Sequence, residues 1–225
     1  MHESPGCGEN LLENGRDRIF RGRGLSWVWM NLVEGEDMAD VSGFPPQAKA
    51  FRFCPGCGTP GMVVRPDRSI LCSSCGFHYY FNTASAVAGI IEDDLGRLLL
   101  IVRGHEPKKG TLDLPGGFID FAETAEDALR REVQEELNLK AGKCTYFGSF
   151  PNTYAHGDII HWTLDLAFVC IVESFEPLAL SDEVEKALFF APPEIELDRV
   201  GFDSIRNILF QYLHSMSTLP PCSLP

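Results

Sequence analysis

Residues 116–139, GGFIDFAETAEDALRREVQEELNL, are the most informative part of this chain for its fold. Thr124 followed by Asp127 has the spacing of a helix capping box, in which the first side chain accepts from a backbone N–H one turn later. Apolar residues recur at every fourth position as one stripe: Leu129, Val133 and Leu137. The stretch therefore predicts an amphipathic helix that follows a glycine loop at residues 114–117.

Three glutamates of this stretch lie within five positions of one another: Glu132, Glu135 and Glu136. At about 100° per residue, Glu132 and Glu136 fall about 40° apart, and Glu135 lies about 60° to the other side of Glu132. All three therefore face one way. One interpretation is a solvated surface whose charges pair four residues apart, as Glu126 would with Arg130. The other is a site that binds cations.

The solvated-surface interpretation also offers the pairs Asp127–Arg131 and Glu136–Lys140. It leaves Glu132 unexplained, because the neighbours of Glu132 four positions away are Ala128 and Glu136. The like-charge penalty is only about 0.2–0.5 kcal/mol and decides little. The loop DLPGG, residues 113–117, favours a cation site, because its backbone oxygens can join the carboxylates in an all-oxygen site suited to Mg²⁺ or Mn²⁺.

The overall charge limits the partners of the chain. Its 225 residues include 32 acidic and 19 basic side chains, for a formal net charge of −13. Such a surface repels a phosphate backbone, so broad nucleic-acid binding is disfavoured. A small phosphorylated substrate stays compatible, because a bound metal ion reverses the field inside an acidic cleft. No apolar run approaches the roughly 20 residues that a membrane span needs, and we expect a soluble, cytoplasmic protein.

Two Cys-x-x-Cys pairs precede the helix, in CPGCG (54–58) and CSSCG (72–76). Their four thiols predict one tetrahedral zinc site: Cys54, Cys57, Cys72 and Cys75. Four protein ligands leave no open position, so the zinc would be structural. The alternative is a pair of disulfides, which needs an oxidising compartment that the N-terminus does not indicate. Cys144 and Cys170 lie in apolar runs and are interpreted as small core residues.

The chain divides into segments by composition. The predicted domains are a disordered tail (1–48), a zinc ribbon (49–82), a catalytic domain (83–214) and a C-terminal tail (215–225). Within the third, two apolar runs around EDDLG predict a hairpin over residues 84–104, and strand-like runs cover 143–150 and 159–172. A last helix follows Asp203. An arginine-rich segment at residues 16–33 leaves organelle import as an alternative localisation.

The helix and its loop carry a family resemblance. The spacing from the glycine loop to the end of the helix resembles the Nudix box, G-x5-E-x7-R-E-U-x-E-E-x-G-U, where U is aliphatic. The matching positions are Gly117, Glu123, Arg131, Glu132, Glu135 and Glu136. One position departs from the box: Asn138 stands where the family has glycine. Asparagine also tolerates the left-handed conformation that a helix end often needs.

The resemblance implies an α/β fold, an α/β/α sandwich around a mixed sheet with the zinc ribbon as an N-terminal appendage. It implies a pyrophosphohydrolase in which Mg²⁺ or Mn²⁺ bridges a diphosphate and water attacks phosphorus. The implied metal ligands are the Gly116 carbonyl and the side chains of Glu132, Glu135 and Glu136, with a later carboxylate at Glu183. Asp182 and Glu185 compete with Glu183 for that role, and Glu135 is alternatively a base that orients water. Glu123 and Arg131 would pair to fix the loop against the helix.

The order of ribbon and Nudix box resembles the NADH pyrophosphatase branch, which cleaves dinucleotides. That branch carries SQPWPFPxS downstream, whereas GSFPNTYAHGD (148–158) keeps Ser149 and Pro151 but replaces the Gln and the Trp. The resemblance implies a nucleoside diphosphate linked to another group, such as NADH or ADP-ribose, and a homodimer is compatible with it. The alternative is a catalytically silent nucleotide-binding or interaction module.

No residue is assigned to substrate binding from the sequence. Four aromatic residues are candidates for stacking on a base: Phe118, Phe121, Tyr154 and Trp162. Aromatic residues near strands are more often part of the core. His156 and His161 are candidates for phosphate contact or proton transfer, against the alternative of exposed loop histidines. Recognition of RNA through the ribbon would need a basic face, and its four cations supply only a modest one: Lys49, Arg52, Arg65 and Arg68.

Overall fold

The computed structural model describes residues 46–157 and 159–217. The chain separates into two units, Met1–Val41 and Ser42–Pro225, and all described residues belong to the second. Three predictions fall wholly or largely outside the described residues: the tail over residues 1–48, the arginine-rich segment at 16–33 and the tail over residues 215–225. Among the described residues, no helix has the length and apolar character that crossing a membrane requires.

The segment with the two Cys-x-x-Cys pairs contains a small antiparallel sheet in the order β1-β2-β3. Its elements are η1 (Pro46–Ala50), β1 (Val63–Val64), β2 (Ser69–Leu71) and β3 (His78–Tyr80). Ile70 on the central strand is fully buried, opposite Tyr79 of β3. Tyr79 also packs with Phe51 and Phe81, with ring centroids 5.3–5.7 Å apart. The apolar core of this segment is small, so another interaction must contribute to its stability.

Two three-stranded sheets follow. Their strands are β4 (Ala84–Ile91), β5 (Leu98–Arg103), β6 (Leu112–Asp113), β7 (Ala141–His156), β8 (Ile159–Val172) and β9 (Val184–Phe190). In the first sheet β8 lies between β4, to which it is parallel, and β7, to which it is antiparallel. In the second sheet β5 pairs antiparallel with both β6 and β9. The predicted mixed sheet is confirmed.

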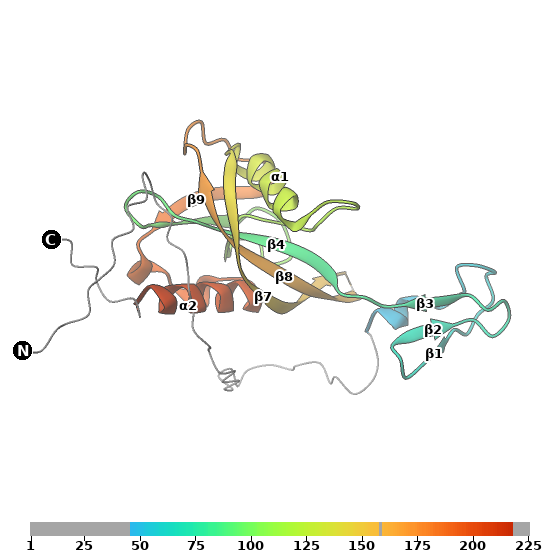
Figure 1. The fold of residues 1–225 in the computed structure, drawn as a ribbon. Coiled ribbons are helices and arrows are strands. Elements are labelled where there is room, and N and C mark those ends of the chain that lie inside the picture. Colours follow the sequence, from blue (N-terminus) through green and yellow to red (C-terminus); the bar gives the residue numbers. More distant parts are fainter. Residues whose placement is uncertain (1–45, 158, 218–225) are drawn as a thin grey trace, which may run out of the picture. The chain divides into compact units, whose positions relative to one another are not determined.

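Two helices cover the strands from opposite sides (Figure 1). They are α1 (Ala125–Leu137) and α2 (Asp203–Ser217), and short turns η2 (Pro192–Glu194) and η3 (Leu197–Arg199) precede α2. Neighbouring residues of one strand enter different cores: Leu99 of β5 packs in the cluster under α1, and Leu100 packs in the cluster under α2. The predicted α/β/α sandwich is therefore confirmed.

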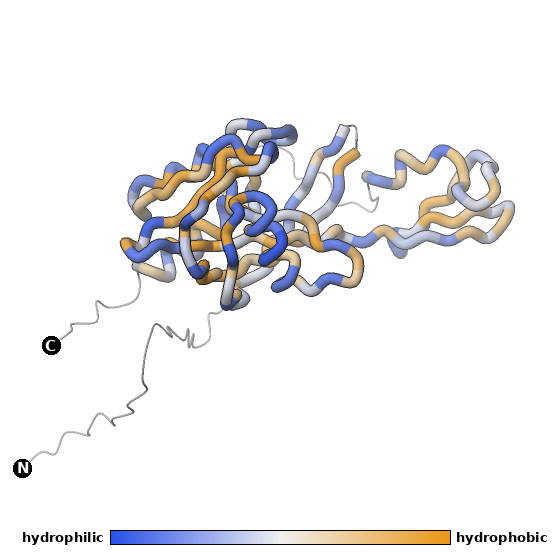
Figure 2. The backbone as a smooth tube through the Cα atoms, turned by 90° about the horizontal axis from the view of Figure 1, so that it is seen from above, coloured by the Kyte–Doolittle hydropathy of each residue, from blue (hydrophilic) through white to orange (hydrophobic). Residues whose placement is uncertain are grey.

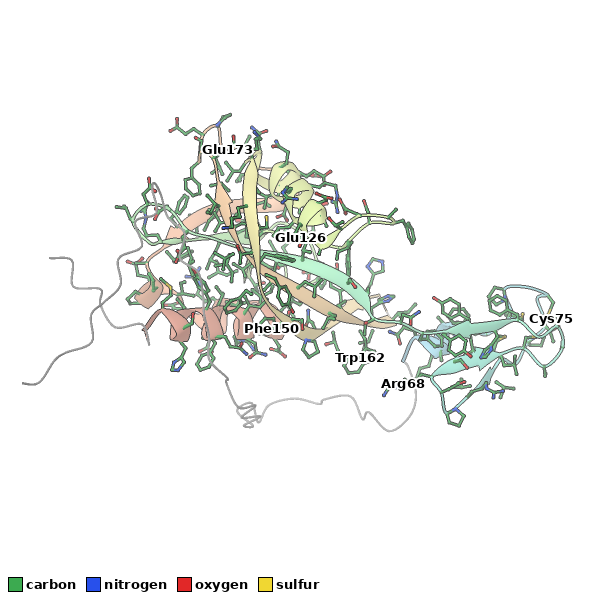
Figure 3. All side chains as sticks on the ribbon, viewed as in Figure 1. Arg68, Cys75, Glu126, Phe150, Trp162 and Glu173 are labelled. Carbon is green, nitrogen blue, oxygen red and sulfur yellow. The ribbon has the colours of Figure 1, made fainter. Side chains whose placement is uncertain are left out.

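Each helix contributes its apolar face to one core. Leu129 and Val133 of α1 are fully buried, as are Ile208 and Leu209 of α2. Phe150 of β7 belongs to the cluster under α2, and Figure 3 shows it beside that helix. Strands β4 and β5 are apolar and are buried over most of their length, as strands covered on both faces must be. Figure 2 shows predominantly hydrophobic segments in this part of the chain. The last helix forms as predicted, but it includes Asp203, which the sequence placed before it, and it extends to Ser217, beyond the domain end predicted at residue 214.

The predicted hairpin over residues 84–104 is wrong. β4 runs parallel to β8, from Ala84 opposite Thr163 to Ile91 opposite Cys170, while β5 belongs to the other sheet. The predicted hairpin pairing is limited to one isolated antiparallel bridge between Glu92 and Leu98. Continuous apolar runs fit strands buried on both faces, and such runs do not identify their partners.

Candidate active site on helix α1

Local interactions fix both ends of α1. The Thr124 hydroxyl oxygen accepts from the Asp127 backbone N–H at 3.2 Å, which satisfies a donor of the first turn. At the other end Asn138 adopts φ 55° and ψ 30°, the left-handed conformation expected where the family has glycine. The apolar stripe that includes Leu129 and Val133 is fully buried. The polar face is therefore held in one orientation toward the glycine loop.

Arg131 joins that loop to the helix. Its guanidinium donates to both carboxylate oxygens of Glu123, each at 3.0 Å, and to the Phe118 carbonyl at 3.0 Å. It also donates to Glu132 at 2.8 Å and to Glu135 at 3.1 Å. The hydrogen bonds from Arg131 hold the pKa of Glu123 below its usual range, and the contacts with Glu123 raise the pKa of Arg131. Arg131 therefore pairs with Glu123 of the loop and not with Asp127, the partner that the solvated-surface interpretation predicted.

The three clustered glutamates have different surroundings. Glu136 is buried, and its carboxylate accepts from the Gly116 N–H at 3.0 Å. Burial raises the pKa of Glu136 to about 8, and the charge of Glu132 adds to the shift. The Glu132 side chain is 13% exposed and its pKa is likewise raised by burial, whereas the Glu135 side chain is 60% exposed. Two of the three glutamates thus hold oxygen atoms in a poorly solvated place.

The loop at residues 114–117 runs against β4. The Val87 N–H donates to the Gly117 carbonyl at 2.8 Å, and the Gly89 N–H donates to the Pro115 carbonyl at 2.8 Å. Gly116 has φ 149°, and a side-chain carbon there would collide with the Val87 carbonyl. A side-chain carbon on Gly117 would lie 2.5 Å from Oε1 of Glu132. Glycine is therefore required at both positions, because Gly116 lies against the backbone of β4 and Gly117 lies against the Glu132 carboxylate.

Replacing Gly117 by Ala should displace the Glu132 carboxylate while leaving the fold nearly unchanged, because the atoms that must move are the end of a flexible side chain. We expect the hydrolysis that the family resemblance implies to fall by up to about 100-fold, which a misplacement of about 1 Å can cost. Formation of the monophosphate products and the thermal unfolding midpoint measure the two effects. Gly142→Ala is the matched control, since its added carbon meets one atom, at 3.4 Å. Equal loss of activity in both variants would contradict this account.

The residues fit a hard divalent cation by their chemistry. Carboxylate and backbone carbonyl oxygens are the donors that Mg²⁺ and Mn²⁺ prefer, and Glu132, Glu136 and Gly116 supply them. A carboxylate with a pKa of about 8 retains a proton at neutral pH unless another positive charge replaces that proton, so a cation would favour ionised Glu136. The Glu183 charge also acts on both glutamates. In the described part of the chain no three carboxylates bring their oxygens within 4.8 Å of one another.

Glu183 acts on this site through its charge, and a backbone contact fixes its position. It immediately precedes β9, and its carbonyl accepts from the Gly104 N–H at 2.8 Å at the end of β5. A side-chain carbon on Gly104 would lie 2.9 Å from that carbonyl oxygen. Neither Asp182 nor Glu185 is among the charges that shift the pKa values of Glu132 and Glu136, whereas Glu183 is.

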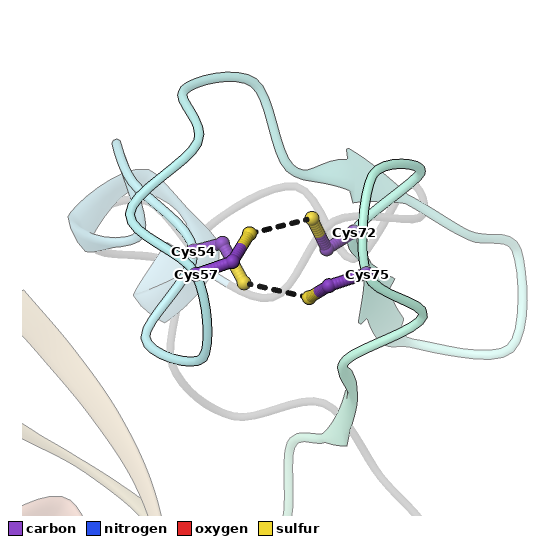
Figure 4. Close-up of side chains that lie close together, drawn as sticks. All are labelled: Cys54, Cys57, Cys72 and Cys75. Atoms are coloured by element: carbon purple, nitrogen blue, oxygen red, sulfur yellow. Dashed lines mark hydrogen bonds between the residues drawn. The ribbon is translucent and has the colours of Figure 1, made fainter.

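The four ribbon cysteines converge as predicted (Figure 4). Their sulfurs all lie within 4.8 Å of one another, with Cys54 to Cys75 at 3.6 Å and Cys57 to Cys72 at 3.7 Å. All four are free thiols, which favours a metal site over the alternative of two disulfides. The Gly56 N–H donates to the Cys54 sulfur at 3.3 Å, the type of contact that supports thiolate ligands. This arrangement is compatible with structural Zn²⁺.

A cavity beside the glycine loop is lined both by residues that the sequence singled out and by residues that it did not. Its lining includes Gly116, Phe118, Tyr154 and Phe202, and the rings of Phe118 and Tyr154 meet edge to face at 5.5 Å. Trp162, Phe121, His156 and His161 are not among its lining residues. Two of the four aromatic candidates are therefore brought to the cavity.

Two buried carboxylates also line this cavity. Asp113 pairs with Arg103 at 2.9 Å, and burial raises the pKa of Asp113 to about 6. Asp165 accepts from Thr163 at 3.2 Å and from Asn152 at 3.3 Å, and burial raises its pKa. An aspartate inside an apolar strand run, as in WTLDLAF, was the sequence feature that could have indicated this polar cluster.

Comparison with known proteins agrees with this geometry. A family model described as NUDIX domain matches residues 82–210. An NAD-capped RNA hydrolase NudC of Pseudomonas putida (strain W619) is 27% identical over 228 residues, covering 99% of this chain and 74% of the relative. An ADP-ribose pyrophosphatase of Methanocaldococcus jannaschii is 37% identical over 116 residues, covering 51% of this chain and 65% of the relative.

A crystal structure of a NUDIX hydrolase from Nitrosomonas europaea has the same fold, with a TM-score of 0.61 at 22% identity. The superposition covers 75% of this chain and 94% of that one. The family match spans more than half of the 225 residues and includes the loop, helix α1 and the cavity. The chain therefore belongs to the Nudix family of pyrophosphohydrolases.

Proposed function

We propose that this protein hydrolyses the P–O–P bond of a nucleoside diphosphate linked to a second group, with Mg²⁺ or Mn²⁺ as the catalytic cofactor. The observation that carries the proposal is the contact between α1 and the glycine loop, where the buried Glu136 accepts from the Gly116 N–H at 3.0 Å and Glu132 lies against Gly117. Arg131 offsets the charge of Glu132, whereas the buried Glu136 accepts from a neutral backbone N–H. Burying a carboxylate is unfavourable unless a cation offsets its charge. A diphosphate brings the same need for a counter-charge.

Each charged residue has a proposed role. Glu132, Glu136 and the Gly116 carbonyl would hold the divalent cation, with Glu183 as the additional carboxylate from the β9 side. The cation would neutralise the negative charge that develops on the leaving phosphate. Glu135, the exposed member, would complete the ligand set or orient the attacking water. Arg131 would keep Glu132 and the loop in place through its bond to Glu123, which positions the ligands without touching the substrate.

The cavity next to Gly116 would receive the nucleoside. Both named relatives act on molecules that contain an adenosine diphosphate group, as NAD-capped RNA and ADP-ribose do. Phe118 and Tyr154 offer aromatic surface to a base, and Asp113 and Asp165 offer acceptors for its amino groups. The cavity and the glutamate face share Gly116 and Gly117, so a nucleoside held there leaves its diphosphate at the loop.

Phe118→Ala should weaken substrate binding. Stacking of a base on an aromatic side chain contributes about 1–3 kcal/mol, and about 1.4 kcal/mol corresponds to a tenfold change in an equilibrium constant, so we expect KM to rise about tenfold. Phe118 is 42% exposed and its replacement should hardly affect stability. Phe121→Ala is the matched control, because Phe121 is exposed in the same loop but does not line the cavity. A similar rise in both variants would argue against a stacking role for Phe118.

A hydrolysis panel with Mg²⁺ or Mn²⁺, in which chromatography measures the monophosphate products, tests the function itself. The substrates are NADH, ADP-ribose, nucleotide sugars, dinucleoside polyphosphates, nucleoside triphosphates and NAD-capped RNA. We expect cleavage of NADH or ADP-ribose to exceed that of the triphosphates, and free dinucleotide to exceed capped RNA because the net charge of −13 opposes a polynucleotide. Silence across the whole panel, together with nucleotide binding, would favour the alternative of a silent binding module.

A further inference from the structure

Cys144 and Cys170 lie opposite each other on neighbouring strands. Cys144 of β7 is in register with Cys170 of β8, and their sulfur atoms are 2.9 Å apart. Residues paired across an antiparallel ladder have Cα atoms about 4.5–5.5 Å apart, which is within the range of about 4.4–6.8 Å found for disulfides. Both strands lie in one sheet, so the backbone already brings the two side chains together. In the described residues these are the cysteines outside the ribbon site.

The two thiols are chemically unequal. Cys170 is only 2% exposed, whereas Cys144 is half-buried. The Cys170 thiol donates to the Cys144 sulfur, and this hydrogen bond lowers the pKa of Cys144 while it raises the pKa of Cys170. The positive charge of Arg130 also favours the Cys144 thiolate. Since the thiolate is the nucleophile in disulfide exchange, Cys144 is suited to attack and Cys170 to resolve.

Cys144 lies where the sheet is open to reagents. β7 is at the edge of the β4-β8-β7 sheet, and its pairing with β8 is irregular on both sides of Cys144, between Ala141 and Cys144 and between Tyr146 and Gly148. Bulges of this kind disturb the ladder locally. Tyr146, two residues further along the strand, is 57% exposed. A small reagent can therefore approach Cys144 with little opening of the sheet.

We propose that Cys144 and Cys170 are a redox-active pair that low-molecular-weight disulfides of the glutathione class convert into a cross-strand disulfide. The Cys144 thiolate attacks one sulfur of the small disulfide, forms a mixed disulfide and expels one thiolate. Cys170 then loses its proton and attacks the Cys144 sulfur, which forms the cross-strand bond and expels the second thiolate. The pair loses two electrons and two protons, and the small disulfide is reduced to two thiols.

The bond would act on the layer that supports α1. Cys170 belongs to the same buried cluster as Leu129 and Val133, and Cys144 packs against that cluster. The Arg130 side chain donates from α1 to the Gly142 carbonyl at 3.3 Å, two residues before Cys144. Oxidation would tie β7 to β8 at the place where α1 contacts β7. The proposal is independent of the hydrolytic function, because neither thiol lines the cavity or contacts the clustered glutamates.

Peptide mapping tests the proposal on the full, zinc-loaded chain. After incubation with oxidised glutathione and blocking of the remaining thiols, we expect a digest fragment that joins the Cys144 and Cys170 peptides and disappears on reduction. Cys170→Ser should accumulate Cys144 as a mixed disulfide with glutathione, because the resolving thiol is gone. Cys144→Ser should leave Cys170 unmodified, because Cys170 is buried and is not the attacking thiol.

Absence of the joined fragment at a ratio of oxidised to reduced glutathione that oxidises exposed vicinal thiols would overturn the proposal. Modification of Cys170 in the Cys144→Ser variant would overturn the order of attack. If a variant loses its zinc or its native circular dichroism spectrum, alkylation of the reduced wild-type chain is the alternative test. In that experiment Cys144 should react about tenfold faster than Cys170. Equal rates would contradict the proposed asymmetry.

Discussion

Glu132→Gln should lower the rate of hydrolysis by about 100-fold or more and leave the fold intact. In the wild-type chain Arg131 donates to Glu132 at 2.8 Å, and glutamine keeps the shape of the side chain and an oxygen that can accept this bond. The substitution removes the charge that would hold a divalent cation. A cation supplies several kcal/mol of transition-state stabilisation, and each 1.36 kcal/mol is tenfold in rate. Because burial already raises the pKa of Glu132, neutralising it should not destabilise the protein.

Chromatography of the monophosphate products at saturating Mg²⁺ measures the rate, and calorimetric titration with Mg²⁺ or Mn²⁺ measures the affinity for the cation. Glu126→Gln is the control on the same helix, since Glu126 is exposed on the surface of α1 (Figure 3). It should keep wild-type activity. Full activity of the Glu132→Gln variant would remove Glu132 from the mechanism. Loss of activity with unchanged metal affinity would instead place Glu132 outside the ligand set.

Removal of zinc should unfold the ribbon and leave the two Nudix cores folded. The three ribbon strands have only two or three residues each, and Ile70 is the large apolar side chain that is fully buried among them. A segment of this size takes its folding free energy from the metal, with apparent values of about 10–16 kcal/mol for zinc-finger peptides. The clusters that pack against α1 and α2 contain no ribbon residue.

Cys57→Ser tests this without a chelator, which would also remove Mg²⁺. Cys57 is exposed, and its hydrogen bonds with Thr59 lower its pKa to about 6, as suits a metal-binding thiolate. We expect loss of bound zinc and fast amide exchange at residues 49–82, with the protection of β4 and β5 retained. Cys144→Ser should keep its zinc. If the amides of residues 49–82 stayed protected from exchange in the metal-free Cys57→Ser variant, zinc would not be the source of the ribbon's stability.

Local features of the fold could be predicted because short-range interactions determine them. The cap at Thr124, the buried stripe and the left-handed Asn138 all depend on residues within one or two turns of the helix. The convergence of the four ribbon cysteines followed from ligand spacing, which zinc geometry restricts tightly. The α/β/α sandwich and the mixed sheet were expected from the family resemblance and were confirmed.

Features that join distant segments could not be read from the chain. The hairpin prediction failed because β4 pairs with β8, which starts 75 residues after it. The pair Asp127–Arg131 of the solvated-surface interpretation gave way to Arg131 with Glu123, since the loop folds back on the helix. The aspartate in WTLDLAF could have indicated a buried polar group at Asp165, but its partner Asn152 comes from another strand and could not be identified from the sequence. The domain boundaries and the roles of the site residues stay predictions.

The hydrogen bond from Arg131 to the Phe118 carbonyl has a consequence for selectivity. Phe118 is proposed to recognise the base, and its carbonyl accepts from the same guanidinium that donates to Glu132. A base that fits poorly against the Phe118 ring would therefore displace Glu132 from its position at the scissile bond. Good and poor substrates should then differ in turnover number as well as in apparent affinity. A molecule that fills only the nucleoside cavity would inhibit with an affinity that depends on the presence of Mg²⁺.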